Sequence, residues 1–289
     1  DLERIGMDKT VLARFRNQIR RPYGMVLVTG PTGSGKTTTL YAALSELNDA
    51  TKKIITVEDP VEYRLHRINQ VQVNAHIDLT FARVLRTALR QDPDIVLVGE
   101  MRDQETAQIG LRAAITGHMV LSTLHTNDAI STVNRLIDMG AEGYMVATAL
   151  RAVLAQRLVR KVCVNCKTEY KPDAHELSRI FSILKQNMEG VSFYKGTGCP
   201  HCNNTGYKGR IGVFELLEID ESLADALRKN DSAAFSKAAR SNEGFRPFAL
   251  HAIDYAWQGV TSIDEVIRVA GTLDEDIEIE PPVLSVDDE

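Results

Sequence analysis

The residues of this chain that could do chemistry begin with a glycine-rich loop, Gly30-Pro31-Thr32-Gly33-Ser34-Gly35-Lys36-Thr37. Its spacing is that of a phosphate-binding loop; an apolar run over 25–28 precedes it, and a predicted helix over 38–47 follows it. The glycines let successive backbone N–H groups turn inward, and the start of the helix adds the positive end of its dipole. We therefore predict a nucleoside-triphosphate site. The alternative is a glycine-rich turn with an incidental lysine.

The polar side chains of this loop have separate expected roles. Lys36 would reach the β- and γ-phosphates, and the hydroxyl of Thr37 would bind Mg²⁺. The full set of residues predicted to surround the nucleotide is Gly30, Pro31, Thr32, Gly33, Ser34, Gly35, Lys36, Thr37 and Thr38.

Acidic residues follow two of the predicted strands. Glu100 lies at the end of an apolar strand, where a carboxylate can hold Mg²⁺ or orient the attacking water. Glu58, with Asp59 and Glu62, ends another strand, and clustered acids near a triphosphate suit Mg²⁺ ligation or water activation. The alternative for each is an acid that caps or solvates a turn.

A histidine and three arginines complete the candidates for the nucleotide site. His125 ends the fourth predicted strand, where it could hydrogen-bond the γ-phosphate, although a lone histidine can also be structural. Arg83, Arg86 and Arg90 form a stripe along one face of a predicted helix. They could act on a neighbouring subunit's nucleotide, pair with acids across an interface, or simply form a solvated face.

All four cysteines of the chain lie in two Cys-x-x-Cys pairs, Cys163 with Cys166 and Cys199 with Cys202. Two such pairs are typical of a tetrahedral structural Zn²⁺ site. Two disulfides are the alternative, and a nucleotide-binding chain of the reducing cytosol favours zinc. The 32 residues between the pairs exceed the spacing of compact zinc ribbons, so we expect an inserted helix near 175–188.

The elements that must position these residues alternate between strands and helices, which predicts an α/β fold with a parallel sheet and ligands at its carboxyl edge. The expected strands are 25–28, 53–57, 95–98 and 119–123, with a hairpin over 61–73. The expected helices are 8–20, 38–47, 80–90, 104–116, 128–138 and 143–157.

The predicted organisation has five parts. They are a linker with a leading helix (1–22), a P-loop core (23–158), a tetracysteine zinc module (159–215), a C-terminal helical subdomain (216–271) and an acidic, disordered tail (272–289). The net charge of −5 depends on that tail, which carries eight acids and no base. The rest of the chain has 34 basic and 31 acidic residues, a net charge of +3. Such a small positive charge does not indicate a nucleic-acid-binding protein. Because no Met opens the chain, we expect a fragment of a longer protein.

Taken in order, these motifs resemble those of the secretion ATPases that power type II secretion and type IV pilus assembly. The phosphate loop is followed by an acidic box at 56–62, a second acidic strand at 94–103 and a histidine box that runs from Gly117-His118-Met119 to Leu124-His125-Thr126-Asn127. The cysteine module resembles the assembly branch of the family, since pilus-retraction relatives lack it.

The resemblance implies a RecA-like P-loop core, a hexameric ring, and ATP hydrolysis with Mg²⁺ coupled to rotation of an inner-membrane platform protein. It implies a location at the cytoplasmic face of the bacterial inner membrane, reached through partners, with no nucleic acid bound. It favours Glu100 and Glu58 as catalytic and metal-site acids and makes the arginine stripe a contact to a subunit or nucleotide. The family also carries an N-terminal regulatory region and a second domain that completes the nucleotide pocket, and neither is in this sequence.

Three functions remain as hypotheses. The first is an assembly motor for a pilus or for type II secretion, and the overall resemblance favours the pilus. The second is a DNA or conjugative-transfer motor of related fold, against which the cysteine module argues. The third is a nucleotide-gated scaffold without hydrolysis, against which the intact set Lys36, Thr37, Glu58, Glu100 and His125 argues.

Overall fold

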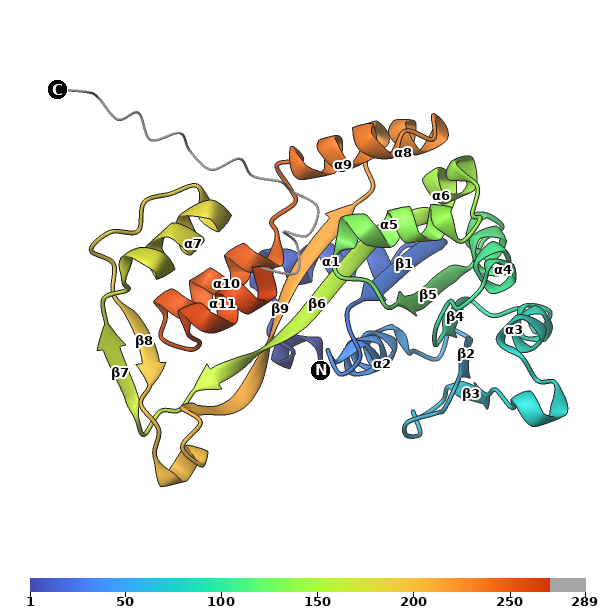
Figure 1. The fold of residues 1–289 in the computed structure, drawn as a ribbon. Coiled ribbons are helices and arrows are strands. Elements are labelled where there is room, and N and C mark those ends of the chain that lie inside the picture. The colour runs from blue at the N-terminus through green and yellow to red at the C-terminus, as the bar shows by residue number, and fades with distance from the viewer. Residues whose placement is uncertain (271–289) are drawn as a thin grey trace.

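The computed structural model describes residues 1–270, so the predicted acidic tail lies outside the described residues. A seven-stranded sheet forms the centre, in the order β3-β2-β4-β5-β1-β6-β9 (Figure 1). Its strands are β1 (Gly24–Thr29), β2 (Ile54–Glu58), β3 (Asn69–Gln72), β4 (Ile95–Val98), β5 (Met119–Leu124), β6 (Leu150–Val162) and β9 (Tyr207–Glu218). All neighbouring pairs are parallel except β6 with β9, which confirms the predicted parallel α/β sheet.

Helices cover both faces of this sheet. They are α1 (Lys9–Ile19), α2 (Lys36–Leu47), α3 (Phe81–Leu89), α4 (Gln104–Ile115), α5 (Ala129–Asp138) and α6 (Gly143–Ala149). Successive side chains of a strand point to opposite faces. Met25 and Leu27 of β1 therefore join the core beneath α3 to α6, while Val26 and Val28 join a second core beneath α1 and α2. Burial on both faces explains why the strands read as continuous apolar runs.

A smaller unit lies at the far end of the long strands β6 and β9 (Figure 1). It consists of β7 (Lys167–Tyr170), α7 (Ala174–Leu184) and β8 (Phe193–Gly196), so the segment between the cysteine pairs does contain the predicted helix. The helices α8 (Glu221–Arg228), α9 (Ser232–Arg240), α10 (Phe248–Trp257) and α11 (Ile263–Ala270) follow. None of the helices within residues 1–270 combines the length and the apolar character that a membrane crossing needs.

Two predicted elements are wrong. Residues 61–73 do not form a hairpin, because β3 pairs in parallel with β2, from Ile55 opposite Asn69 to Glu58 opposite Gln72. The predicted helix over 143–157 ends at Ala149, and its second half is the start of β6. An apolar run of this kind is compatible with a helix or with a buried strand; here pairing with β1 on one side and β9 on the other decides for the strand.

Candidate functional site

The phosphate loop connects β1 to the first turn of α2, as predicted. Gly33 and Gly35 have φ angles of +80° and +89°, in the left-handed region that glycine adopts without steric cost. Among residues 1–270 no side chain caps α2 at Gly35, which leaves the first N–H groups of the helix available to an anion. The loop therefore has the backbone form of a phosphate cradle.

The loop borders a cavity of about 340 Å³ at the carboxyl end of the sheet. Six of the nine predicted nucleotide-binding residues line it, together with all four predicted catalytic residues. The six are Thr32, Gly33, Gly35, Lys36, Thr37 and Thr38, and the four are Lys36, Glu58, Glu100 and His125. Gly30, Pro31 and Ser34 form the rest of the loop, and Ser34 is buried.

A chain of polar contacts crosses this cavity. The Nζ atom of Lys36 donates to the carbonyl of Gly30 at 2.7 Å and lies 3.2 Å from Nδ1 of His125. Because an ammonium group can only donate, Nδ1 accepts, and Nε2 of His125 lies 2.8 Å from a carboxylate oxygen of Glu100. Burial lowers the pKa of Lys36, and the negative charge of Glu100 offsets part of this effect. The loop lysine, the histidine and the acid thus form one connected unit.

The two predicted catalytic acids have different surroundings. Glu100 is partly exposed in the cavity and also accepts from Nε of Arg102 at 2.7 Å. Glu58 is 4% exposed. Its two oxygens accept hydrogen bonds from Tyr41 on one side and from Thr56, at 2.6 Å, on the other. Of these two acids, Glu100, with a side chain that is 22% exposed, is therefore the more accessible to a ligand in the cavity.

The arginine stripe lies outside this cavity. Arg83 pairs with Asp78 at 2.8 Å and Arg86 with Glu105 at 2.5 Å, both on the surface. Phe81, at the start of the same helix, does line the cavity. Within the chain, the structure does not bring Arg83, Arg86 and Arg90 to the phosphate loop.

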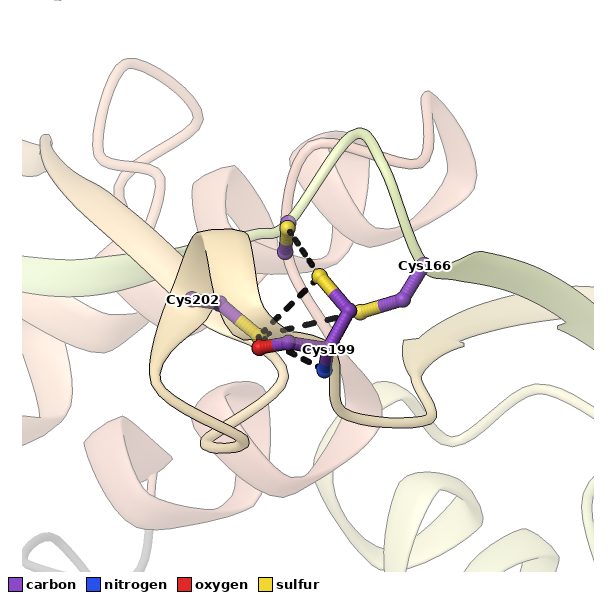
Figure 2. Close-up of side chains that lie close together, drawn as sticks. Cys166, Cys199 and Cys202 are labelled. Carbon is purple, nitrogen blue, oxygen red and sulfur yellow. Dashed lines mark hydrogen bonds between the residues drawn. The ribbon is translucent and has the colours of Figure 1, made fainter.

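The four cysteines come together where β6 ends and before β9 begins, since Cys163 follows Val162 and Cys202 precedes Tyr207. Figure 2 shows the side chains of Cys166, Cys199 and Cys202 converging. The four sulfur atoms lie within 4.8 Å of one another, with distances of 3.8 Å for Cys163–Cys199 and Cys166–Cys202 and 3.7 Å for Cys199–Cys202. Four sulfurs bound to one Zn²⁺ at about 2.3 Å stand about 3.8 Å apart in a tetrahedron, whereas a disulfide needs about 2.05 Å. The thiols are free, and their spacing fits zinc.

The backbone near Cys202 favours its thiolate form, whereas burial raises the pKa of the Cys166 thiol to about 11. Burial would raise the pKa of the Cys202 thiol. The backbone N–H groups of Cys199 and Gly206, at 3.3 and 3.2 Å from its sulfur, outweigh burial and lower that pKa to about 6. A thiolate is the form in which cysteine binds a metal.

Sequence reasoning missed two residues that contact the site. Tyr41 of α2 holds Glu58, and Gln156 of β6 contacts the phosphate loop. In the sequence, Tyr41 resembles an ordinary core residue, and Gln156 lay in a segment expected to be helical. The only sign in the sequence that either residue contacts the site is a polar side chain within a mostly apolar segment.

Comparisons with known proteins agree with this geometry. A family model described as type II/IV secretion system protein matches residues 1–268. The type II secretion system ATPase E of Vibrio cholerae serotype O1 is 49% identical over 271 residues, which cover 93% of this chain and 53% of that protein. The type IV pilus assembly ATPase PilB of Thermus thermophilus is 46% identical over 267 residues, 92% of this chain and 30% of that protein.

Solved structures of related fold were also found. The pilus retraction motor PilT with bound ADP has a TM-score of 0.68 and 27% identity, over 93% of this chain and 66% of that one. The ATPase DotB of Legionella pneumophila has the same TM-score at 24% identity, which supports the fold alone. The chain spans about half the length of the type II secretion proteins that it matches. The match over residues 1–268 places the chain in the type II/IV secretion system protein family.

Proposed function

We propose that this chain binds and hydrolyses ATP with Mg²⁺ as the motor part of a type IV pilus assembly or type II secretion machine. The observation that carries the proposal is the connected unit Lys36–His125–Glu100 beside a phosphate loop in its binding form. Lys36 neutralises charge on the phosphates, and His125 links the phosphate position to Glu100. The pilus retraction motor PilT was solved with bound ADP, which supports an adenine nucleotide as the ligand.

Two residues suit Mg²⁺ in this proposal. Thr37 is exposed and offers a hydroxyl, and Glu100 offers a carboxylate that lines the same cavity. Such a metal neutralises phosphate charge when bound. Glu100, as the accessible acid, orients the water; Glu58, held by Tyr41 and Thr56, keeps the end of β2 in place.

The proposal extends to assembly and partners. One relative, at 49% identity, is named for type II secretion, and another, at 46%, for type IV pilus assembly. The proposal therefore includes both systems as alternatives. We propose a hexameric ring that acts on an inner-membrane platform protein at the cytoplasmic face of the bacterial inner membrane. We also propose that the four cysteines hold one structural Zn²⁺. This proposal keeps the expected division of residues 1–270 into a leading helix, a P-loop core, a zinc module and a helical subdomain.

The test is Mg²⁺-dependent binding and hydrolysis of ATP by the full chain, with Lys36→Ala as the loss variant. We expect that loss of the lysine's charge reduces hydrolysis about a hundredfold or more. Lys53→Ala, a surface lysine away from the loop, is the matched control. ATP turnover that does not depend on Lys36 in a pure preparation contradicts the site. A steep, salt-sensitive stimulation by DNA would instead support a DNA motor.

A further inference from the structure

The side chain of Gln156 makes polar contacts with two parts of the phosphate-loop region, although it belongs to a different strand. It lies on β6 and is 2% exposed. Its Nε2 atom donates to the carbonyl oxygen of Ser34 at 2.5 Å, and its Oε1 atom accepts from the hydroxyl of Thr39 at 2.6 Å. One amide therefore joins the loop and the first turn of α2 to the central sheet.

The backbone of β6 also packs directly against the loop. A Cβ atom at Gly30 would lie 2.4 Å from the carbonyl oxygen of Gln156, and one at Gly35 would lie 3.1 Å from its Nε2. Both glycines have φ angles in the left-handed region, +155° and +89°. The glycines thus allow the close approach that brings the Gln156 amide to the loop.

The loop needs such a partner for a simple reason. When its N–H groups turn toward a phosphate, its carbonyl groups turn away from it, and a buried carbonyl without a hydrogen bond is costly. The Ser34 hydroxyl is buried and has no hydrogen-bond partner among residues 1–270, so this residue is held through its backbone. The side-chain amide of Gln156 supplies the hydrogen-bond donor for the backbone carbonyl of Ser34.

We propose that Gln156 is a positioning residue that holds the phosphate loop in its binding form before nucleotide arrives. The proposal rests on the proposed ATP site. Without the two hydrogen bonds of the amide, the glycine-rich loop samples other conformations, and each binding event must order it again. Nucleotide affinity falls, while the groups that contact the phosphates stay the same.

The experiment compares Gln156→Met with Gln18→Met in the full chain. Gln18 is a matched control because it is also a buried glutamine, 8% exposed, whose amide donates to Glu218 at 2.8 Å far from the loop. Gln156→Met should weaken binding of a non-hydrolysable ATP analogue with Mg²⁺ about tenfold, and KM should rise more than kcat falls. Gln18→Met should lower the melting temperature similarly and leave affinity unchanged. Equal affinities in the two variants overturn the proposal.

A second measurement separates this proposal from that of the ATP site. Hydrogen exchange over residues 30–36, measured without nucleotide, should be faster in Gln156→Met than in Gln18→Met. Unchanged exchange overturns the role of Gln156 even if ATP binds, and faster exchange supports it even if the wild-type chain binds no ATP. If Gln156→Met does not fold, Thr39→Val is compared with Thr39→Ser. Thr39→Ser removes only a methyl group, whereas Thr39→Val loses the bond to Gln156, together with a longer 3.2 Å bond to the carbonyl of Gly35. Thr39→Val should weaken affinity about threefold relative to Thr39→Ser. No loss of affinity in Thr39→Val counts against the proposal.

Discussion

At the scale of single residues, the structure separates two glutamates that the sequence left equivalent. Glu100 contacts His125 and Arg102 at the cavity wall, and Glu58 is buried with both oxygens bonded. Glu58 is 4% exposed, whereas the side chain of Glu100 is 22% exposed, so a water or a metal in the cavity reaches Glu100 more readily. The difference leads to opposite expectations for the two substitutions.

Glu100→Gln should slow hydrolysis about a hundredfold while ATP still binds, because the amide is a poor proton acceptor. Glu58→Gln should mainly lower stability, because it weakens the contacts with Tyr41 and Thr56. Single-turnover hydrolysis together with nucleotide titration measures both effects. Full hydrolysis by Glu100→Gln, with loss in Glu58→Gln, would transfer the catalytic role to Glu58.

Glu215 of β9 should make stability depend on pH. It is buried and accepts from the backbone N–H groups of Ala129 and Phe248, yet burial outweighs these bonds and raises its pKa to about 8. The folded chain therefore holds this proton more tightly than the unfolded chain. The resulting stabilisation is complete below about pH 4.5 and is lost as pH rises through about 8.

Urea unfolding at about pH 6 and about pH 8.5 measures this effect. The wild-type chain should lose more unfolding free energy between the two conditions than Glu215→Gln does. Glu265→Gln is the contrasting control: the salt bridges of Glu265 to Arg160 and Arg268 outweigh burial and lower its pKa, so its contribution stays constant in this range. Parallel pH profiles for the wild-type chain and Glu215→Gln would disprove the role of Glu215.

At the scale of elements, β6 and β9 connect the two parts of the molecule. Both strands belong to the central sheet, and both end at the cysteines, with Val162 opposite Tyr207 at the last paired position. The β7–β8 unit has only a two-stranded sheet and one helix. A unit of this size has too small a core to be stable alone, and a structural metal is one common remedy.

Removal of the proposed Zn²⁺ should therefore unfold residues 163–206 while the main sheet stays folded. A strong chelator, or Cys166→Ser, should expose this segment to proteases and to hydrogen exchange. Thr168→Ser serves as the control variant, because it changes an exposed residue two positions away and leaves all four sulfurs in place. Metal analysis of the purified chain completes the test. A metal-free preparation whose segment 163–206 remains protected would refute the zinc site.

At the scale of the whole molecule, the arginine stripe does not line the cavity beside the phosphate loop of its own chain. Arg83 and Arg86 pair with exposed acids, and such surface pairs contribute little to stability. In the proposed ring they would be free to exchange these partners for a neighbouring subunit's phosphates or acids.

Arg86→Ala should lower turnover per chain at concentrations where the ring forms, with unchanged ATP affinity and melting temperature. Arg228→Ala removes a comparable exposed pair, with Glu221 at 2.8 Å, and should have no effect on turnover. Turnover and sedimentation measured across protein concentrations test this. Equal turnover in the two variants at every concentration would remove Arg86 from the proposed subunit contact.

The sequence by itself determined the features that depend on local spacing. These are the phosphate loop, the paired cysteines, the helices α3 and α5, and the alternation that leads to a parallel sheet. Backbone conformation and short-range chelation decide such features, so a linear pattern is sufficient to predict them.

Only the tertiary structure decided the features that depend on partners distant in the chain. Residues 150–157 became a strand because β1 and β9 offered hydrogen bonds on both sides, and β3 joined β2 in parallel rather than as a hairpin. Gln156 meets Ser34 across 122 positions, and Glu215 meets Ala129 across 86. A buried polar group must find a partner wherever the fold provides one, and the order of residues along the chain does not contain that choice.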